Sequence, residues 1–244
     1  EISECLVGSE MCIRDSPWVV GNKIVIDENI KKWIRQTKEY AQKDYNNHTT
    51  LWSPQWTQDQ GPDGNVFGFF YSTWGINFTL MGNALADSSK PAEKGNGIYG
   101  DYAVCEGPQA YYWGGTWMCV SPNTDNADMV YDFIKYFTVD EASMEKYALG
   151  KPEYVNNMNV MQKIVDEKSN SNPLLGGQDQ FAVLHETAKN IDLNGLITPY
   201  DASIKQAFID AVNAYCAGET ADAAACIEDF KDRVAESVTD ITVD

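Results

Sequence analysis

The sequence predicts a protein of the α/β or α+β class that is richer in helix towards its C-terminus. The length of 244 residues allows one large domain or two small ones. Compact runs of Val, Phe and Tyr follow turn signals in the first half, whereas apolar residues recur at helical spacing after Pro122. With 43% apolar and 22% charged residues the composition is globular, and no apolar run approaches the roughly 18 residues of a membrane span.

The charge balance narrows the classes of partner. The chain carries 18 basic and 36 acidic residues, which gives a formal net charge of −18. A field of this sign repels the phosphates of nucleic acids and the headgroups of anionic membranes. We therefore expect no nucleic-acid partner, and a neutral partner or substrate suits the charge.

The first expected element is a helix that Asp27 caps and that runs to about Tyr45. Its buried side is defined by residues at helical spacing, namely Ile30, Trp33, Ile34, Thr37 and Ala41. Residues 46–64 are polar and interrupted by prolines and glycines, and Pro62-Asp63-Gly64 predicts a turn.

Three strands are expected in the next part of the chain. Asn65–Tyr71 is a compact Val/Phe/Tyr run, and Asp101–Glu106 and Trp117–Ser121 are shorter ones. Residues 86–100 are rich in Gly, Ser and Lys and predict a loop.

The remainder reads as successive helices. Asn123 or Asp125 can cap the first, Gly218 stops the fourth, and Thr220 begins the last. Their apolar stripes are Ala127, Val130, Ile134 and Phe137; Met158, Met161 and Val165; Phe181, Leu184, His185 and Ala188; Ile204, Ala207, Phe208, Ala211, Val212 and Tyr215; and Ala223, Cys226, Phe230 and Val234.

Four cysteines fall in two pairs. Cys105 and Cys119 flank a short loop, and Cys216 and Cys226 lie on either side of a glycine. Each pair is either a disulfide or two buried free thiols. A Cys105–Cys119 bridge would contribute roughly 3 kcal/mol in the loop-entropy model. No Cys-x-x-Cys is present and the two histidines lie far from both pairs, so we expect no metal site.

Other chemical motifs are weak. Gly95–Gly100 matches Gly-x-Gly-x-x-Gly, but a dinucleotide site needs a helix after this turn, and strand-like Tyr102–Val104 follows instead. We therefore expect no cofactor. His185 lies on an apolar helical stripe, so we interpret it as a hydrogen-bonded core residue rather than a catalytic base.

The aromatic content of 12% is the strongest functional signal. Three successive aromatic residues, Tyr111 to Trp113, precede Gly114-Gly115, and neighbours in an extended chain point to opposite sides, so one core cannot hold them all. The glycine pair lets the backbone approach a ligand. Pyranose rings offer flat C–H faces to indole, and burying one Trp contributes at most about 4–6 kcal/mol. We expect Trp74 and Trp113 to contact a carbohydrate, and Trp33 and Phe70 to pack in a core.

Residues 1–16 differ in character from the chain after Pro17. They lack the basic region and the apolar stretch of a signal peptide. They resemble the translated adaptor-like stretches found at the ends of metagenomic gene models. We expect this leader, with Cys5 and Cys12, to lie outside the fold, and an export signal to precede the sequence.

Several motifs follow one another in a defined order. They are Gly64–Trp74, Gly100–Val104, Gly107-Pro108, Tyr112–Trp117, Ser121-Pro122-Asn123, the helix segment 133–137, and Pro199-Tyr200-Asp201. In this order, over about Pro17 to Val234, they resemble family 1 extracellular solute-binding proteins, which are the carbohydrate receptors of ABC importers.

The resemblance implies a two-lobe α/β fold of the type II periplasmic-binding-protein kind, incomplete in this chain. One lobe would comprise residues 17–112 and 199–244, and residues 119–195 would supply helices of the other. The crossings would lie near 113–118 and 196–199. The sheet of the second lobe would come from preceding residues, so its helices would expose their apolar stripes.

The resemblance also implies a receptor and not an enzyme. The complete protein would be an extracellular, lipid-anchored monomer that closes on a sugar or oligosaccharide and delivers it to an ABC permease. The implied ligand-binding residues are Tyr71, Trp74, Trp113, Gly114, Gly115, Trp117, Tyr200 and Asp201, with the Gly176-Gly177-Gln178 loop as a further candidate. The alternatives are a fragment of a secreted glycoside hydrolase, which needs two carboxylates flanking a sugar bond, and a structural surface domain without a small ligand.

Overall fold

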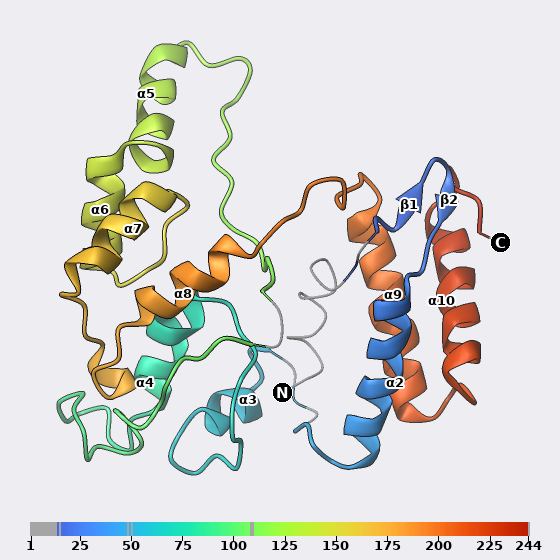
Figure 1. Cartoon of the computed structure of the whole chain (residues 1–244), viewed down its shortest axis with the longest axis horizontal. Helices are drawn as coiled ribbons and strands as arrows, with labels where there is room; N and C mark the ends of the chain where they lie inside the picture. The colour runs from blue at the N-terminus through green and yellow to red at the C-terminus, as the bar shows by residue number, and fades with distance from the viewer. Residues whose placement is uncertain (1–13, 15, 48, 50, 108–109, 244) are drawn as a thin grey trace.

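The computed structural model describes residues 14, 16–47, 49, 51–107 and 110–243. Most of the expected leader, with Cys5 and Cys12, therefore lies outside the described residues, as does His48. The described chain is mostly helical (Figure 1). Its one sheet is a hairpin of β1 (Val19–Val20) and β2 (Lys23–Ile24), paired antiparallel.

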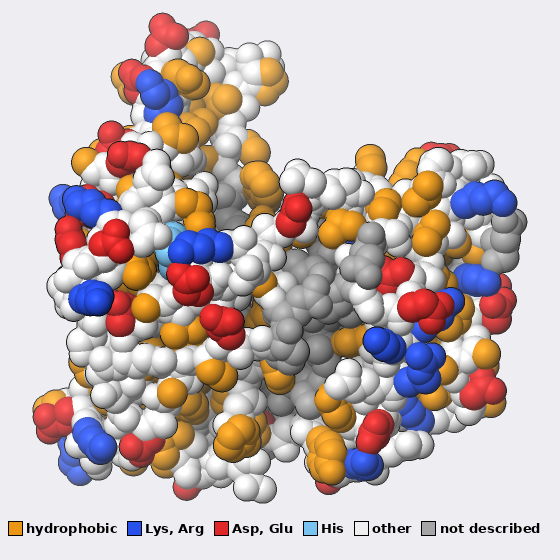
Figure 2. Space-filling view, in the orientation of Figure 1, with side chains coloured by type: hydrophobic (Ala, Val, Ile, Leu, Met, Phe, Trp, Pro, Cys, Tyr) orange, Lys and Arg blue, Asp and Glu red, His pale blue; other side chains and the backbone are white. Residues whose placement is uncertain are grey.

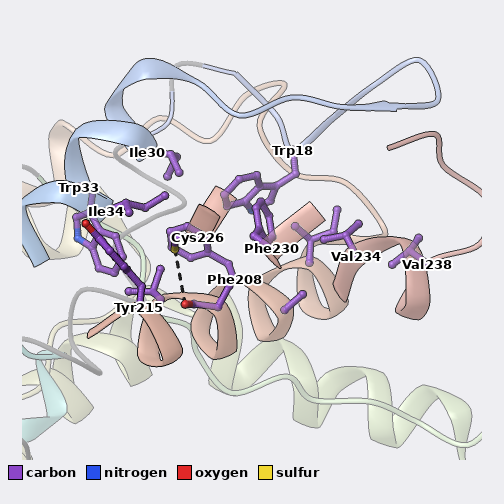
Figure 3. Packing of buried hydrophobic residues seen from close by; sticks show 14 of the residues in the cluster. Trp18, Ile30, Trp33, Ile34, Phe208, Tyr215, Cys226, Phe230, Val234 and Val238 are labelled. Atoms are coloured by element: carbon purple, nitrogen blue, oxygen red, sulfur yellow. Dashed lines mark hydrogen bonds between the residues drawn. The ribbon is translucent and has the colours of Figure 1, made fainter. Parts of the chain in front are cut away.

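Three helices from the two ends of the sequence pack into a compact unit, called the closed body below. They are α2 (Glu28–Gln42), α9 (Asp201–Ala217) and α10 (Ala223–Ser237), which lie side by side beneath the hairpin (Figure 1). Trp18 packs at their centre, with its ring 5.5 Å from Phe208 and 5.3 Å from Phe230 (Figure 3). The buried residues of this core are Trp18, Val19, Ile30, Trp33, Ile34, Ile204, Ala207, Phe208, Ala211, Val212, Tyr215, Cys226, Phe230, Val234, Val238 and Ile241.

The ends of these helices follow from local chemistry. Asp27 accepts a hydrogen bond from the backbone N–H of Ile30 at 3.0 Å, which confirms the predicted cap. Gly218 ends α9 with φ of +87°, as expected for a left-handed C-cap. The last helix begins at Ala223 and not at Thr220, because Asp222 accepts the backbone N–H groups of the first turn.

A second cluster forms around short helices in the middle of the chain. These are α3 (Pro54–Asp59), the π-helical turn η1 (Ile76–Leu80), α4 (Met81–Asn83) and the 3₁₀ turn η2 (Pro173–Leu175). Helix α3 was not expected from the sequence, although Ser53 caps it and Pro54 occupies its first position. The buried residues of the cluster are Ile76, Leu80, Ala84, Tyr99, Leu174 and Leu175.

A third cluster joins α6 (Glu141–Gly150), α7 (Met158–Glu167) and α8 (Gln180–Lys189). Amide side chains tie it to the second cluster. Asn77 donates to the carbonyl of Pro152 at 2.6 Å, Gln180 donates to the same oxygen at 2.7 Å, and Asn172 donates to Gln180 Oε1 at 2.5 Å. Segments expected in different lobes thus share one polar network.

Helix α5 (Ala127–Thr138) buries none of its residues. It projects from the body and packs against α6 (Figure 1). Apolar side chains are visible along the arm that carries it (Figure 2). Its N-cap is Asn126, without a side-chain hydrogen bond, so the predicted caps Asn123 and Asp125 were wrong. The expected exposure of apolar stripes in residues 119–195 is found at α5. It was wrong for α7 and α8, which bury apolar residues in the third cluster.

The three strands expected over Asn65–Tyr71, Asp101–Glu106 and Trp117–Ser121 do not form in the described chain. A strand needs a neighbour to satisfy its backbone, and no described segment pairs with these three as a strand. At Val104 a side chain takes that place, because the Gln178 amide accepts from the Val104 N–H at 2.8 Å and donates to its carbonyl at 2.7 Å. Phe70 is correspondingly 37% exposed and does not belong to a core.

The predicted loop over residues 86–100 is confirmed. Asn96 holds it in shape, since its side chain accepts from the Asp87 N–H at 3.0 Å and donates to the carbonyls of Asp87 and Pro91. No helix follows Gly100 directly, so the glycine motif is a structural turn. Among the described residues, no helix has both the length and the hydropathy to cross a membrane.

Candidate functional site

Two indoles stack in parallel at the surface beside α3 and η1. The rings of Trp52 and Trp74 lie 5.4 Å apart between centroids with an interplanar angle of 5°. Phe78 stands nearly perpendicular to both, 6.2 Å from Trp52 and 6.1 Å from Trp74. Trp52 is 60% exposed and Phe78 71% exposed, so the aromatic corner faces solvent.

An inner layer of two rings, buried Trp56 and half-buried Tyr71, supports this corner. The rings of Trp56 and Tyr71 lie edge to face at 5.7 Å, and each contacts the stacked pair, Trp56 at Trp52 and Tyr71 at Trp74. The Tyr71 hydroxyl is hydrogen-bonded to Thr79 Oγ1 and accepts from Gln60 Nε2. The rings of the corner are therefore anchored from below.

Gly75 is required where it stands, next to this layer. A Cβ at this position would lie 1.8 Å from the Tyr71 ring, far inside van der Waals contact. Because residue 75 is glycine, η1 can begin in direct contact with the Tyr71 ring.

The backbone of Trp52 is strained. Its φ is +67°, in the left-handed region that bulky residues avoid. Such a conformation costs of the order of 1–3 kcal/mol and persists where surrounding contacts impose it. Ser53 follows as the cap of α3, which fixes the chain immediately after Trp52.

The loop over residues 113–117 lies outside the aromatic corner. Trp113 is half-buried, Trp117 is 81% exposed, and among the described residues neither ring contacts another aromatic ring. Gly114 and Gly115 are exposed. Just before this loop, Tyr111 bonds to the corner's support, donating its hydroxyl to the Tyr71 carbonyl at 2.6 Å.

Tyr200 and Asp201 belong to the closed body. Tyr200 is the N-cap residue of α9 and packs against its core. Asp201 accepts from the Thr198 hydroxyl at 2.6 Å and pairs with Arg14 at 3.6 Å. Both therefore have structural partners at a helix start, and the structure does not bring them to the aromatic corner.

The four cysteines described are free thiols, so of the two alternatives neither disulfide forms. Cys226 is buried, donates to the Ala211 carbonyl at 3.6 Å (Figure 3), and burial raises its pKa to about 12. Burial also raises the pKa of Cys216. Cys105 and Cys119 are exposed, which differs from the alternative of buried thiols.

His185 is a core histidine, as interpreted from the sequence. It is 1% exposed, with Nδ1 2.9 Å from the Tyr154 hydroxyl and Nε2 3.0 Å from Gln162 Oε1. Burial lowers its pKa. Next to Tyr154 in the sequence, burial raises the pKa of the Glu153 carboxyl to about 7.

Two shallow hollows lie on either side of Ala86 and contain none of the predicted ligand-binding residues. The larger, about 450 Å³, lies between the end of α3 and α4 and is lined partly by Thr57, Asp63 and Asn83. The smaller, about 340 Å³, lies over the loop that follows. In the described part of the chain no group of three His, Cys, Asp or Glu side chains is arranged to hold a metal.

Two members of the corner, Trp52 and Phe78, were not among the expected binding residues. A signal was present for Phe78: Ile76, Thr79 and Leu80 are the buried side of η1, so a helical reading of this short run places Phe78 on the outer side.

Searches with this chain found no matching protein-family model, no matching curated protein and no matching solved structure.

Proposed function

We propose that the chain binds carbohydrate at the corner formed by Trp52, Trp74 and Phe78. The observation that carries the proposal is the solvent-facing parallel indole pair with a perpendicular phenyl ring at its side. Aromatic rings left exposed in this way, and held from beneath, mark binding surfaces more often than packing. The charge of −18 suits a neutral ligand such as a sugar.

The chemistry of the corner matches a pyranose. A sugar ring can lay its C–H face on an indole and set its edge against Phe78, while its hydroxyls remain in water. One such contact, covering an indole of roughly 150–250 Å², supports at most about 4–6 kcal/mol before ordering costs.

The wider role that we propose is that of an extracellular, monomeric, lipid-anchored receptor of an ABC importer, with two lobes in the complete protein. One support is the resemblance of the ordered motifs. The other is the pair of features that an α/β fold without part of its sheet would show, namely strand-like segments without partners and an exposed apolar face on α5. The closed form would hand the sugar to a membrane permease.

Titration calorimetry of the full chain with glucose, maltotriose, cellotriose and xylotriose tests the proposal. We expect one of these sugars to bind, and Trp74→Ala to weaken that binding at least tenfold, or about 1.4 kcal/mol. Trp74→Phe keeps a ring in place and should lose less. Phe78→Ala should have an intermediate effect.

Trp117→Ala is the matched control, since it removes an exposed indole outside the corner. Unchanged binding is expected. If Trp117→Ala abolished binding and Trp74→Ala did not, the binding surface would be the 113–117 loop instead. Release of shorter sugars during the titration would favour the glycoside hydrolase alternative, and no binding by any sugar would contradict the proposed function.

A further inference from the structure

We propose that Trp52 is a displaceable cover: in the ligand-free chain it occupies the face of Trp74 on which a sugar ring binds, and binding moves it aside. The inference rests on the proposed function and deepens it by assigning opposite roles to the two indoles. Trp74 is the platform, and Trp52 competes with the ligand for it.

The geometry of the pair shows why one face of Trp74 is taken. Rings whose planes differ by 5° with centroids 5.4 Å apart are offset and stacked, so Trp52 lies over part of the Trp74 ring. No third ring fits between them at this separation. A pyranose can reach that face only where the Trp52 indole leaves it.

The two indoles differ in exposure and in backbone strain, as expected if Trp52 moves and Trp74 does not. Each indole has a supporting ring, Trp56 at 5.3 Å for Trp52 and Tyr71 at 5.2 Å for Trp74, so the difference lies in exposure. Trp74 is half-buried, whereas Trp52 is 60% exposed. Trp52 is also the residue with the strained backbone, at φ of +67°. A change of φ to the ordinary region relieves the strain and swings the indole away, while Trp74 stays in place.

The slot left behind defines the ligand class. Its floor is Trp74, and Phe78 stands at 76° to that floor, 6.1 Å away. A ligand ring must therefore present one flat apolar face and one apolar edge, with its polar groups on the side facing water. A neutral pyranose has this form, and a flat aromatic acid is disfavoured by the charge of the chain.

The side-chain N–H signals of the tryptophans in a ¹H–¹⁵N NMR spectrum test the inference. Trp52→Phe identifies the Trp52 signal, which the ring current of Trp74 shifts from the position of a free indole. On saturation with the sugar that calorimetry identifies, we expect this signal to move towards that of exposed Trp117. A sugar has no ring current of its own, so the movement reports the loss of the stack.

The variant Trp52→Ala sharpens the test. Removing a competitor should tighten sugar binding, by about threefold or more, whereas Trp74→Ala weakens it. A Trp52 signal that stays in place at saturation, or a Trp52→Ala variant that binds as poorly as Trp74→Ala, would overturn the inference and leave the proposed function standing.

A ligand-free measurement covers the case in which no sugar binds and the proposed function fails. On warming, the Trp52 signal should move to the free-indole position while the helical circular dichroism is unchanged. A Trp52 signal that moves only with global unfolding shows that the cover is fixed, and the inference is then wrong regardless of any ligand.

Discussion

The closed body and the arm carrying α5 use the same kind of amphipathic helix with opposite results. In α9, all six residues of the apolar stripe are buried, in the core shared with α2 and α10. In α5, Met129, Tyr131, Phe133, Tyr136 and Phe137 are each more than half exposed. Phe133 and Phe137 contact one another at 4.9 Å, but they have no second layer.

The difference teaches that a helical period predicts a helix and a face, not a core. A core forms where the chain returns with complementary helices, as residues 201–237 do onto α2. Isolated helices of about 12 residues are marginal in water, and most of their stability comes from packing. The arm therefore has the sequence of a packed helix and the surroundings of a surface one.

The largest expected effect separates the two regions by stability. Phe208→Ala removes a fully buried ring that contacts Trp18, Trp33 and Phe230, and should cost about 3–5 kcal/mol, roughly a thousandfold in the folding equilibrium. Phe137→Ala on α5 should change it by less than about 0.5 kcal/mol. Urea unfolding followed by tryptophan fluorescence measures both, and equal losses would show that the arm is packed after all.

Thiol reactivity makes the same comparison without a mutation. Cys226 lies in the closed core with its pKa raised to about 12 by burial, so little thiolate exists and reagent cannot reach it. Cys119 is exposed. At pH 8 we expect iodoacetamide to label Cys119 at least a hundredfold faster than Cys226, as read by peptide mass spectrometry. Comparable rates would mean that the body opens readily.

The smallest expected effect is a pH dependence confined to the α6–α8 region. Burial raises the folded pKa of Glu153 from its ordinary 4.5 to about 7, so the folded state binds the proton more tightly. Stability is then lost as pH rises from about 4.5 to 7. After allowance for solvent screening the loss is of the order of 1 kcal/mol.

Glu153→Gln should remove this loss. Hydrogen exchange of α7 and α8 at pH 5 and pH 7.5 measures it, with α9 amides as the internal reference. His185 acts in the opposite direction, because burial lowers its pKa and stability is lost as pH falls below its ordinary 6.5. If the protection of α9 followed pH in the same way, the two regions would be one cooperative unit.

The closed body was predictable, and the middle of the chain was not. Asp27, Gly218 and the stripes of α2, α9 and α10 are local signals that their neighbours reinforce. The three expected strands failed because strand formation depends on a partner that no local pattern reveals. At Val104 the side-chain amide of Gln178 bonds to the backbone N–H and carbonyl, as a neighbouring strand would have done.

The candidate site was predictable in part. Trp74 and Tyr71 were expected and lie together, but the ring that covers Trp74 comes from Trp52, twenty-two residues earlier. Its position depends on a positive φ at a tryptophan, which residue preferences argue against. The resemblance also grouped Tyr200 and Asp201 with the site, whereas the start of α9 employs them.

The hydrogen bonds that hold the Asn96 side chain have a consequence for deamidation during storage. Asn followed by Gly is the sequence at which chains deamidate most readily, since the next backbone nitrogen can attack the side-chain carbonyl carbon. At Asn96-Gly97 three hydrogen bonds hold that carboxamide away from such an attack, whereas Asn194-Gly195 lies exposed in the linker before α9. Stored protein should therefore acquire its first new negative charge at Asn194. The loop over residues 86–100 keeps its shape until Asn96 itself is deamidated.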